Sequence, residues 1–136
     1  ELQAEGHTLF VTTQYVGEAA YCDIVGVMYA GKLLMVETPE NLRKKAFGGE
    51  TVRIKTAELI RYENRTNLQR LPFVQSKIKV INDQEIEVIV DEASMAIPEL
   101  VEACKGEGIT IETIEEILPP FDDVFVRLIE KENANV

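Results

Sequence analysis

Few residues in this chain are able to do chemistry. His7 is the sole histidine, so no serine or cysteine nucleophile can be paired with an imidazole base, and a hydrolase is not expected. His7 has no cysteine nearby and is a poor candidate for a metal ligand. Cys22 and Cys104 stand far apart, outside any C-x-x-C motif, which predicts free, buried thiols in a reducing compartment. Carboxylates are plentiful, but they alternate with apolar residues as a solvated face does.

Composition narrows the choice of partners. The 136 residues carry 24 acids and 14 bases, a net charge of −10, which argues against nucleic acid or anionic lipid as a direct partner. No apolar run is long enough to predict a membrane span. The first six residues lack the features of a signal peptide and resemble the tail of a helix, so we expect a piece of a longer protein.

The first 50 residues predict an α/β unit. Apolar runs predict strands at 7–13, 24–30 and 33–36, with a brief helix at 15–22 and a tight turn at Ala30-Gly31-Lys32. Thr38 and Pro39 are typical of a helix start, and Gly48-Gly49 is expected to end that helix, with Leu42 and Phe47 facing inward.

From Thr51 to Ile117 the pattern predicts the order βαββαβ. Strands are expected at 51–56, 75–81 and 85–90 and from Ile109 onward, with a helix at 63–71. A second helix would bury Ile97, Leu100, Val101 and Cys104, and it would tolerate Pro98 in its first turn. This is the ferredoxin-like arrangement, in which two helices cover one face of an antiparallel sheet. The predicted class is therefore α/β (α+β), with domains at 1–50 and 51–136.

One more helix is predicted after Pro119-Pro120. Its apolar face comprises Phe121, Val124, Phe125 and Leu128. We expect this face to pack against the sheet of its own domain. The alternative is that these residues, or exposed strand edges, mediate self-association or dock a partner.

Two stretches together resemble the ATPases of ABC transporters. Residues 8–23, TLFVTTQYVGEAAYCD, are similar to the switch region, where an apolar strand ends in Thr-Thr-His and a helix with Glu-Ala precedes Cys-Asp. The following VGVMYAGKLL and TPENL resemble the family's next hairpin and helix. The sequence departs from the family at Ile24, often Arg, and at Glu37, often Gly. The last 86 residues, with Asp123-Val124-Phe125, resemble the small domain appended to drug- and polysaccharide-exporter ATPases.

The resemblance implies a site at Gln14. The family's strand-end histidine contacts the γ-phosphate of ATP and orients the attacking water, and Gln14 stands in its place. A glutamine amide can donate a hydrogen bond but cannot carry positive charge, so a weak or degenerate ATP site is one hypothesis. The resemblance further implies ATP and Mg²⁺ in the parent protein, a second ATPase subunit and a membrane-spanning subunit as partners, and a place at the inner face of the membrane.

The catalytic motifs of such an ATPase are absent from these 136 residues. They contain no G-x-x-x-x-G-K-[ST] loop, no Leu-Ser-Gly-Gly-Gln segment and no apolar strand ending in Asp-Glu. We therefore expect this piece alone to be inactive, with its final domain acting as a regulatory or subunit-pairing module. The alternative is a ferredoxin-like module that senses a small molecule or binds a protein, with no ATPase role.

Overall fold

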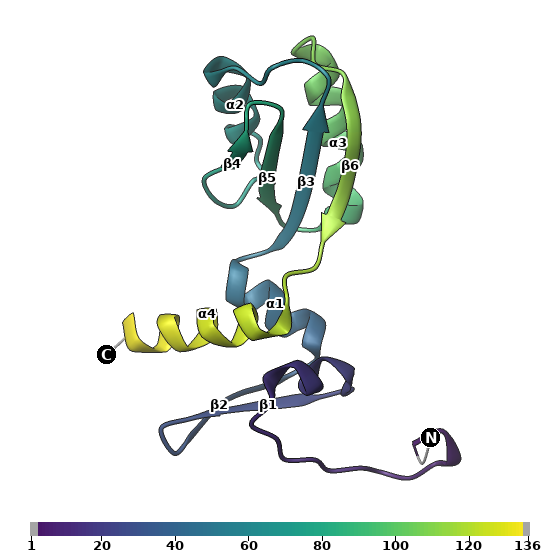
Figure 1. The fold of residues 1–136 in the computed structure, drawn as a ribbon, viewed down its shortest axis with the longest axis vertical. Helices are drawn as coiled ribbons and strands as arrows, with labels where there is room; N and C mark the ends of the chain where they lie inside the picture. The colour runs from purple at the N-terminus through teal and green to yellow at the C-terminus, as the bar shows by residue number, and fades with distance from the viewer. Residues whose placement is uncertain (1–2, 135–136) are drawn as a thin grey trace.

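The computed structural model describes residues 3–134, which form two hydrophobic cores. One core belongs to a four-stranded sheet with two helices, and the other to a β-hairpin with its neighbouring helices (Figure 1). The predicted mixed α/β class is confirmed. In chain order the elements are η1 (Gln3–Glu5), η2 (Val16–Tyr21), β1 (Val25–Tyr29), β2 (Lys32–Glu37), α1 (Pro39–Phe47), β3 (Glu50–Thr56), α2 (Tyr62–Gln69), β4 (Lys79–Asn82), β5 (Glu85–Val90), α3 (Ala93–Gly106), β6 (Ile111–Ile117) and α4 (Phe121–Ala134).

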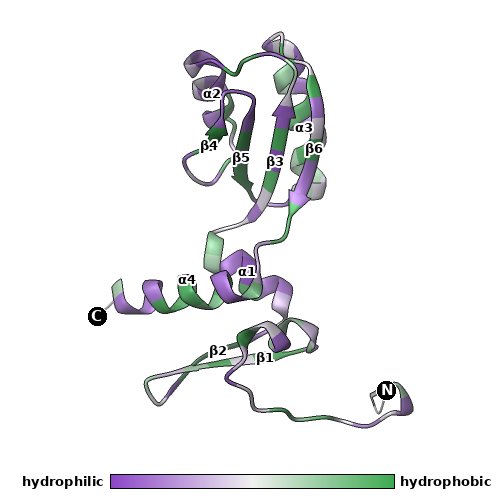
Figure 2. Ribbon diagram, in the orientation of Figure 1, coloured by the Kyte–Doolittle hydropathy of each residue, from purple (hydrophilic) through white to green (hydrophobic). Residues whose placement is uncertain are grey.

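The larger sheet has the strand order β4-β5-β3-β6, and all neighbouring strands are antiparallel. Val52 lies opposite Val88 and both are fully buried, whereas Arg53 and Glu87 lie opposite each other on the other face. Figure 2 shows this alternation of hydrophobic and hydrophilic residues along β3. Because side chains alternate between the faces of a strand, the register leaves one face apolar and the other solvated.

Helices α2 and α3 cover the apolar face of this sheet, behind it in Figure 1. Leu68 of α2 and Leu100 and Cys104 of α3 are buried against the central strands. The predicted face of α3 was partly wrong, because Ala96 is buried while Val101 is exposed. Small alanines let the helix lie close to the sheet, and they were not recognised as core residues.

Two further expectations in this part were wrong. Pro98 is the sixth residue of α3 rather than a member of its first turn, so the Ser94 carbonyl has no amide donor at the helical spacing. The strand predicted at 75–81 begins only at Lys79. The side chain of Gln69 hydrogen-bonds the Ser76 carbonyl at 2.7 Å and the Ile78 amide at 2.8 Å, which draws this stretch out of the sheet.

The smaller sheet is the predicted hairpin of β1 and β2. Its turn places Ala30 and Gly31 at positive φ, 52° and 78°, as a tight two-residue hairpin turn requires. The helix α1 follows, capped by the Thr38 hydroxyl, which accepts the Asn41 N–H at 3.2 Å. It ends at Gly48 with φ 79°, as expected.

The predicted strand at 7–13 does not form. Residues 7–13 are extended but exposed, Phe10 to 95%, and within the described residues no strand pairs with them. A strand is stable only when neighbours satisfy its backbone groups, so the apolar run was not sufficient.

The last helix also lies elsewhere than expected. Phe121, Val124 and Leu128 are buried, but in the core formed by the hairpin and α1, and not against the four-stranded sheet (Figure 1). Phe125 is half-buried in the same core. The expectation that α4 covers its own sheet is therefore wrong, and so is a docking face made of Phe121, Val124 and Leu128.

Candidate functional site

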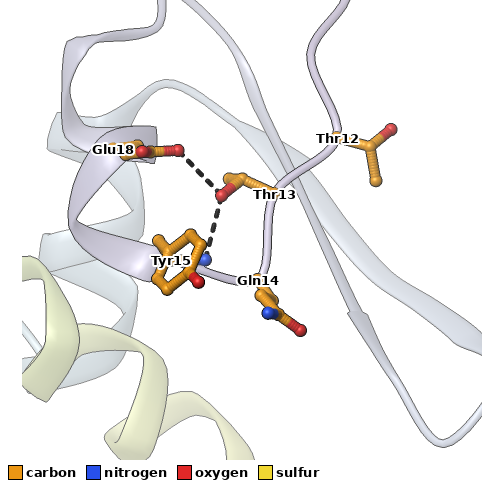
Figure 3. Close-up of a pocket in the computed structure, with 5 residues that line it drawn as sticks. All are labelled: Thr12, Thr13, Gln14, Tyr15 and Glu18. Carbon is orange, nitrogen blue, oxygen red and sulfur yellow. Dashed lines mark hydrogen bonds between the residues drawn. The ribbon is translucent and has the colours of Figure 1, made fainter.

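Gln14 lies in a turn between the extended segment and η2. The hydroxyl of Thr13 accepts a hydrogen bond from the Tyr15 N–H at 2.9 Å and donates one to the Glu18 carboxylate at 2.8 Å. These two bonds close the turn around Gln14. Figure 3 shows the Gln14 side chain directed away from Glu18; Thr12, Thr13, Tyr15 and Glu18 line a pocket together with it. The exposed amide can donate a hydrogen bond to an anionic ligand there.

The element that holds this turn is η2. Its residues Val16, Ala19 and Ala20 are half-buried and pack on the core that contains α4 and α1. The Glu18 N–H donates to the Tyr15 carbonyl at 3.0 Å, and η2 begins at Val16, two residues after Gln14. The position of Gln14 therefore depends on how η2 packs.

A second cluster of charged groups lies where α1 meets the end of the larger sheet. A cleft of about 270 Å³ is lined there by Glu40 and Lys44 of α1, Glu50 of β3 and Glu116 of β6, among others. Glu50 accepts the Ala93 N–H at 2.8 Å and so caps α3. Partial burial and then the neighbouring charge of Glu50 raise the pKa of Glu116. This cluster lies between the two parts of the molecule, and the charge of Lys44 opposes the rise in the pKa of Glu116.

The remaining candidates for chemistry are isolated. Cys104 is buried, and burial, followed by the charge of Glu107, raises the pKa of its thiol to about 11. Cys22 is free but exposed, so the prediction of two buried thiols holds for Cys104 alone. The Nε2 atom of His7 lies 3.9 Å from Oε2 of Glu5, and both side chains are exposed. Among the described residues no group of histidines, cysteines and carboxylates could hold a metal ion.

Sequence reasoning missed the residues that fix these sites. Thr13 and Glu18 carried a signal, since a hydroxyl and a carboxylate five residues apart flank the predicted site. Glu50 carried none, because its contact with Ala93 joins residues 43 positions apart. The role assigned to Gln14 stays a prediction.

No helix within residues 3–134 combines the length and hydropathy needed to cross a bilayer.

Comparisons with known proteins show which family the chain is related to. The family model described as "ATP-binding protein DrrA1-3-like, C-terminal domain" matches residues 38–129. The daunorubicin resistance ATP-binding protein DrrA2 of Streptomyces coeruleorubidus is 28% identical over 134 residues, covering 93% of this chain and 39% of DrrA2. The probable multidrug ABC transporter ATP-binding protein YbhF of Escherichia coli is 41% identical over 46 residues, 34% of this chain and 8% of YbhF.

The chain thus spans well under half the length of these relatives, and no solved structure matches it. The resemblance to ABC transporter ATP-binding proteins is confirmed. From the turn before α1 to the middle of α4, this chain belongs to the family of DrrA1-3-like C-terminal domains of ATP-binding proteins.

Proposed function

We propose that this chain is part of the ATP-binding subunit of an ABC transporter that uses ATP to export its substrate. The observation that supports this most strongly is the match over 93% of the chain to DrrA2, a daunorubicin resistance ATP-binding protein. Because the chain covers only 39% of DrrA2, the phosphate-cradling loop and the magnesium-binding strand would belong to the remaining part of such a protein. ATP and Mg²⁺ would bind there, and Gln14 would approach the γ-phosphate.

The partners follow from the same proposal. The intact subunit would pair with a second ATPase subunit and with a membrane-spanning subunit, at the cytoplasmic face of the membrane. Self-association through the apolar face of α4 is not part of the proposal, because that face is buried within the chain.

The final domain would be an accessory module that regulates or pairs the subunits, with a boundary near residue 50. The strand order β4-β5-β3-β6, with α2 and α3 on one face, supports a ferredoxin-like assignment, since that fold places its first strand between the third and the fourth. The return of α4 to the first part supports a regulatory role over an independent one.

Replacing Gln14 by His in the full-length subunit tests the assigned site. If Gln14 weakens the ATP site, Gln14→His should raise kcat for ATP hydrolysis by roughly tenfold or more, because imidazole can carry charge and exchange a proton. Gln75→His, at an exposed position on the other part, is the matched control and should change nothing. An unchanged kcat would contradict the degenerate site, and failure of the full-length protein to bind Mg-ATP would contradict the function itself.

The cleft between α1 and the sheet favours one alternative, a small-molecule-sensing module. A thermal-shift screen of this chain with amino acids and nucleotides separates the two functions, because a ligand of the folded state must raise the melting temperature. A saturable shift with an amino acid, together with no nucleotide binding by the intact protein, would favour sensing.

A further inference from the structure

Helix α4 follows the four-stranded sheet in sequence but packs on the other part of the molecule. Only Leu118 to Pro120 separate it from β6. The Arg43 Nε donates to the Pro119 carbonyl at 3.3 Å, and the Arg43 guanidinium lies 5.4 Å from the centre of the Phe121 ring. The link is therefore short, contains two prolines of fixed φ and is tied to α1.

The opposite end of α4 is anchored as well. The Arg127 guanidinium lies 5.2 Å from the centre of the Phe47 ring, and the Lys131 ammonium donates to the Lys45 carbonyl. Between these two anchors, Val124 and Leu128 are 0% and 5% exposed. From Phe121 to Lys131, about three turns, the helix is thus fixed against α1 and the hairpin.

The same helix packs on η2. Short 3₁₀ helices have poor hydrogen-bond geometry and are marginal alone, and no residue of η2 is fully buried. The elements that η2 contacts most are α4 and then α1, and its half-buried Val16, Ala19 and Ala20 pack on the core that these helices share. The bond from Thr13 to Glu18 then ties the Gln14 turn to η2.

We propose that α4 is the element by which the final domain holds η2, and with it the Gln14 turn, in position for ATP hydrolysis. The proposal rests on the function proposed above and names the regulatory contact. The chain of contacts starts at β6 and passes through the Pro119-Pro120 link to α4. Apolar packing connects α4 to η2, and the Thr13–Glu18 hydrogen bond connects η2 to the Gln14 turn.

The test uses the full-length subunit with Leu128→Ala, which removes apolar contact from the α4 core. Hydrogen–deuterium exchange of residues 12–21 should quicken by roughly fivefold or more, since exchange follows the local opening equilibrium. The kcat for ATP should fall by a similar factor while ATP binding is retained. Val126→Ala, at a position of α4 that is 54% exposed, is the matched control and should leave both quantities unchanged.

Two measurements separate this effect from general unfolding. Exchange of β3 and β5 should be the same in every variant, because their core contains no residue of α4. Val16→Ala on η2 should reproduce the effect, and the double variant should be less than additive because both changes weaken the packing of η2 on the same core.

The outcomes distinguish the two proposals. A wild-type subunit that does not bind Mg-ATP contradicts the proposed function, while the exchange data still test the contact between α4 and η2. If the wild type is active but Leu128→Ala leaves either the hydrogen–deuterium exchange of residues 12–21 or kcat unchanged, the proposed role of α4 is contradicted.

Discussion

At the scale of single residues, the two thiols differ most clearly in reactivity. Cys104 lies in the core between α3 and the sheet, and the thiolate is disfavoured because the pKa of the thiol is raised to about 11. Cys22 is exposed at the end of η2. Since the thiolate is the nucleophile, the native chain should present one reactive cysteine and one inert cysteine.

We therefore expect Ellman's reagent at pH 8 to modify one thiol per native chain and both in denaturant. Cys22→Ser should abolish the fast modification, which we assign to the exposed Cys22, and leave only the slow modification of the buried Cys104. Fast labelling of Cys104 in the Cys22→Ser variant would show that the core between α3 and the sheet opens readily, contrary to its burial.

At the scale of elements, Gly49 allows the chain between α1 and β3 to pass close to the end of β5. A Cβ at Gly49 would overlap the Val90 carbonyl oxygen and press on the Ile89 side chain. The overlap is with backbone, which cannot move aside as a flexible side chain can. The chain therefore enters β3 beside β5 only with glycine at this position.

Gly49→Ala should lower the free energy of unfolding by about 1–3 kcal/mol, the usual cost of overpacking. Urea unfolding followed by circular dichroism measures this change. Gly106→Ala is the control, because a Cβ there meets nothing within 4 Å and alanine favours the helix. Equal stability of Gly49→Ala and the wild type would mean that the β3–β5 contact relaxes without cost.

Helices and strands were predictable from the sequence where nearby residues, through hydrophobic periodicity or capping, determine them. The alternation of Ile86, Val88 and Val90 and the Thr38-Pro39 helix start predicted β5 and α1 within a residue or two. The pattern failed where the outcome depends on distant partners. The run at 7–13 has apolar side chains, yet nothing in the described chain pairs with it. Residues 76–78 leave the sheet where the Gln69 side chain hydrogen-bonds the backbone of Ser76 and Ile78, contacts that no periodicity reveals.

The same distinction applies to the site. Gln14 could be singled out by resemblance, whereas the hydrogen bond from Thr13 to Glu18 is evident only in the folded structure. The apolar face of α4 was predictable from the spacing of Phe121, Val124 and Leu128. The core in which this face is buried was not predictable, because periodicity shows which side of a helix is buried but not which neighbour buries it.

At the scale of the whole molecule, the two cores share no buried residue. All buried residues of the sheet core lie between Val52 and Ile109, whereas the other core draws on both β1 to α1 and α4. The polypeptide between α1 and α4 is therefore a module inserted into the sequence of the smaller core. This arrangement makes the smaller core dependent on both ends of the chain, and leaves the sheet independent of them.

Two fragments test this dependence. A fragment of residues 50–118 retains the whole sheet core and should unfold cooperatively as a monomer. A fragment of residues 51–136 also carries α4, but without the surfaces that bury Phe121, Val124 and Leu128, so it should self-associate as its concentration rises. Sedimentation of both fragments measures this, with Leu128→Asp in the longer one as the control that restores a monomer. A monomeric 51–136 would instead mean that α4 finds a place on the sheet once α1 and the hairpin are removed.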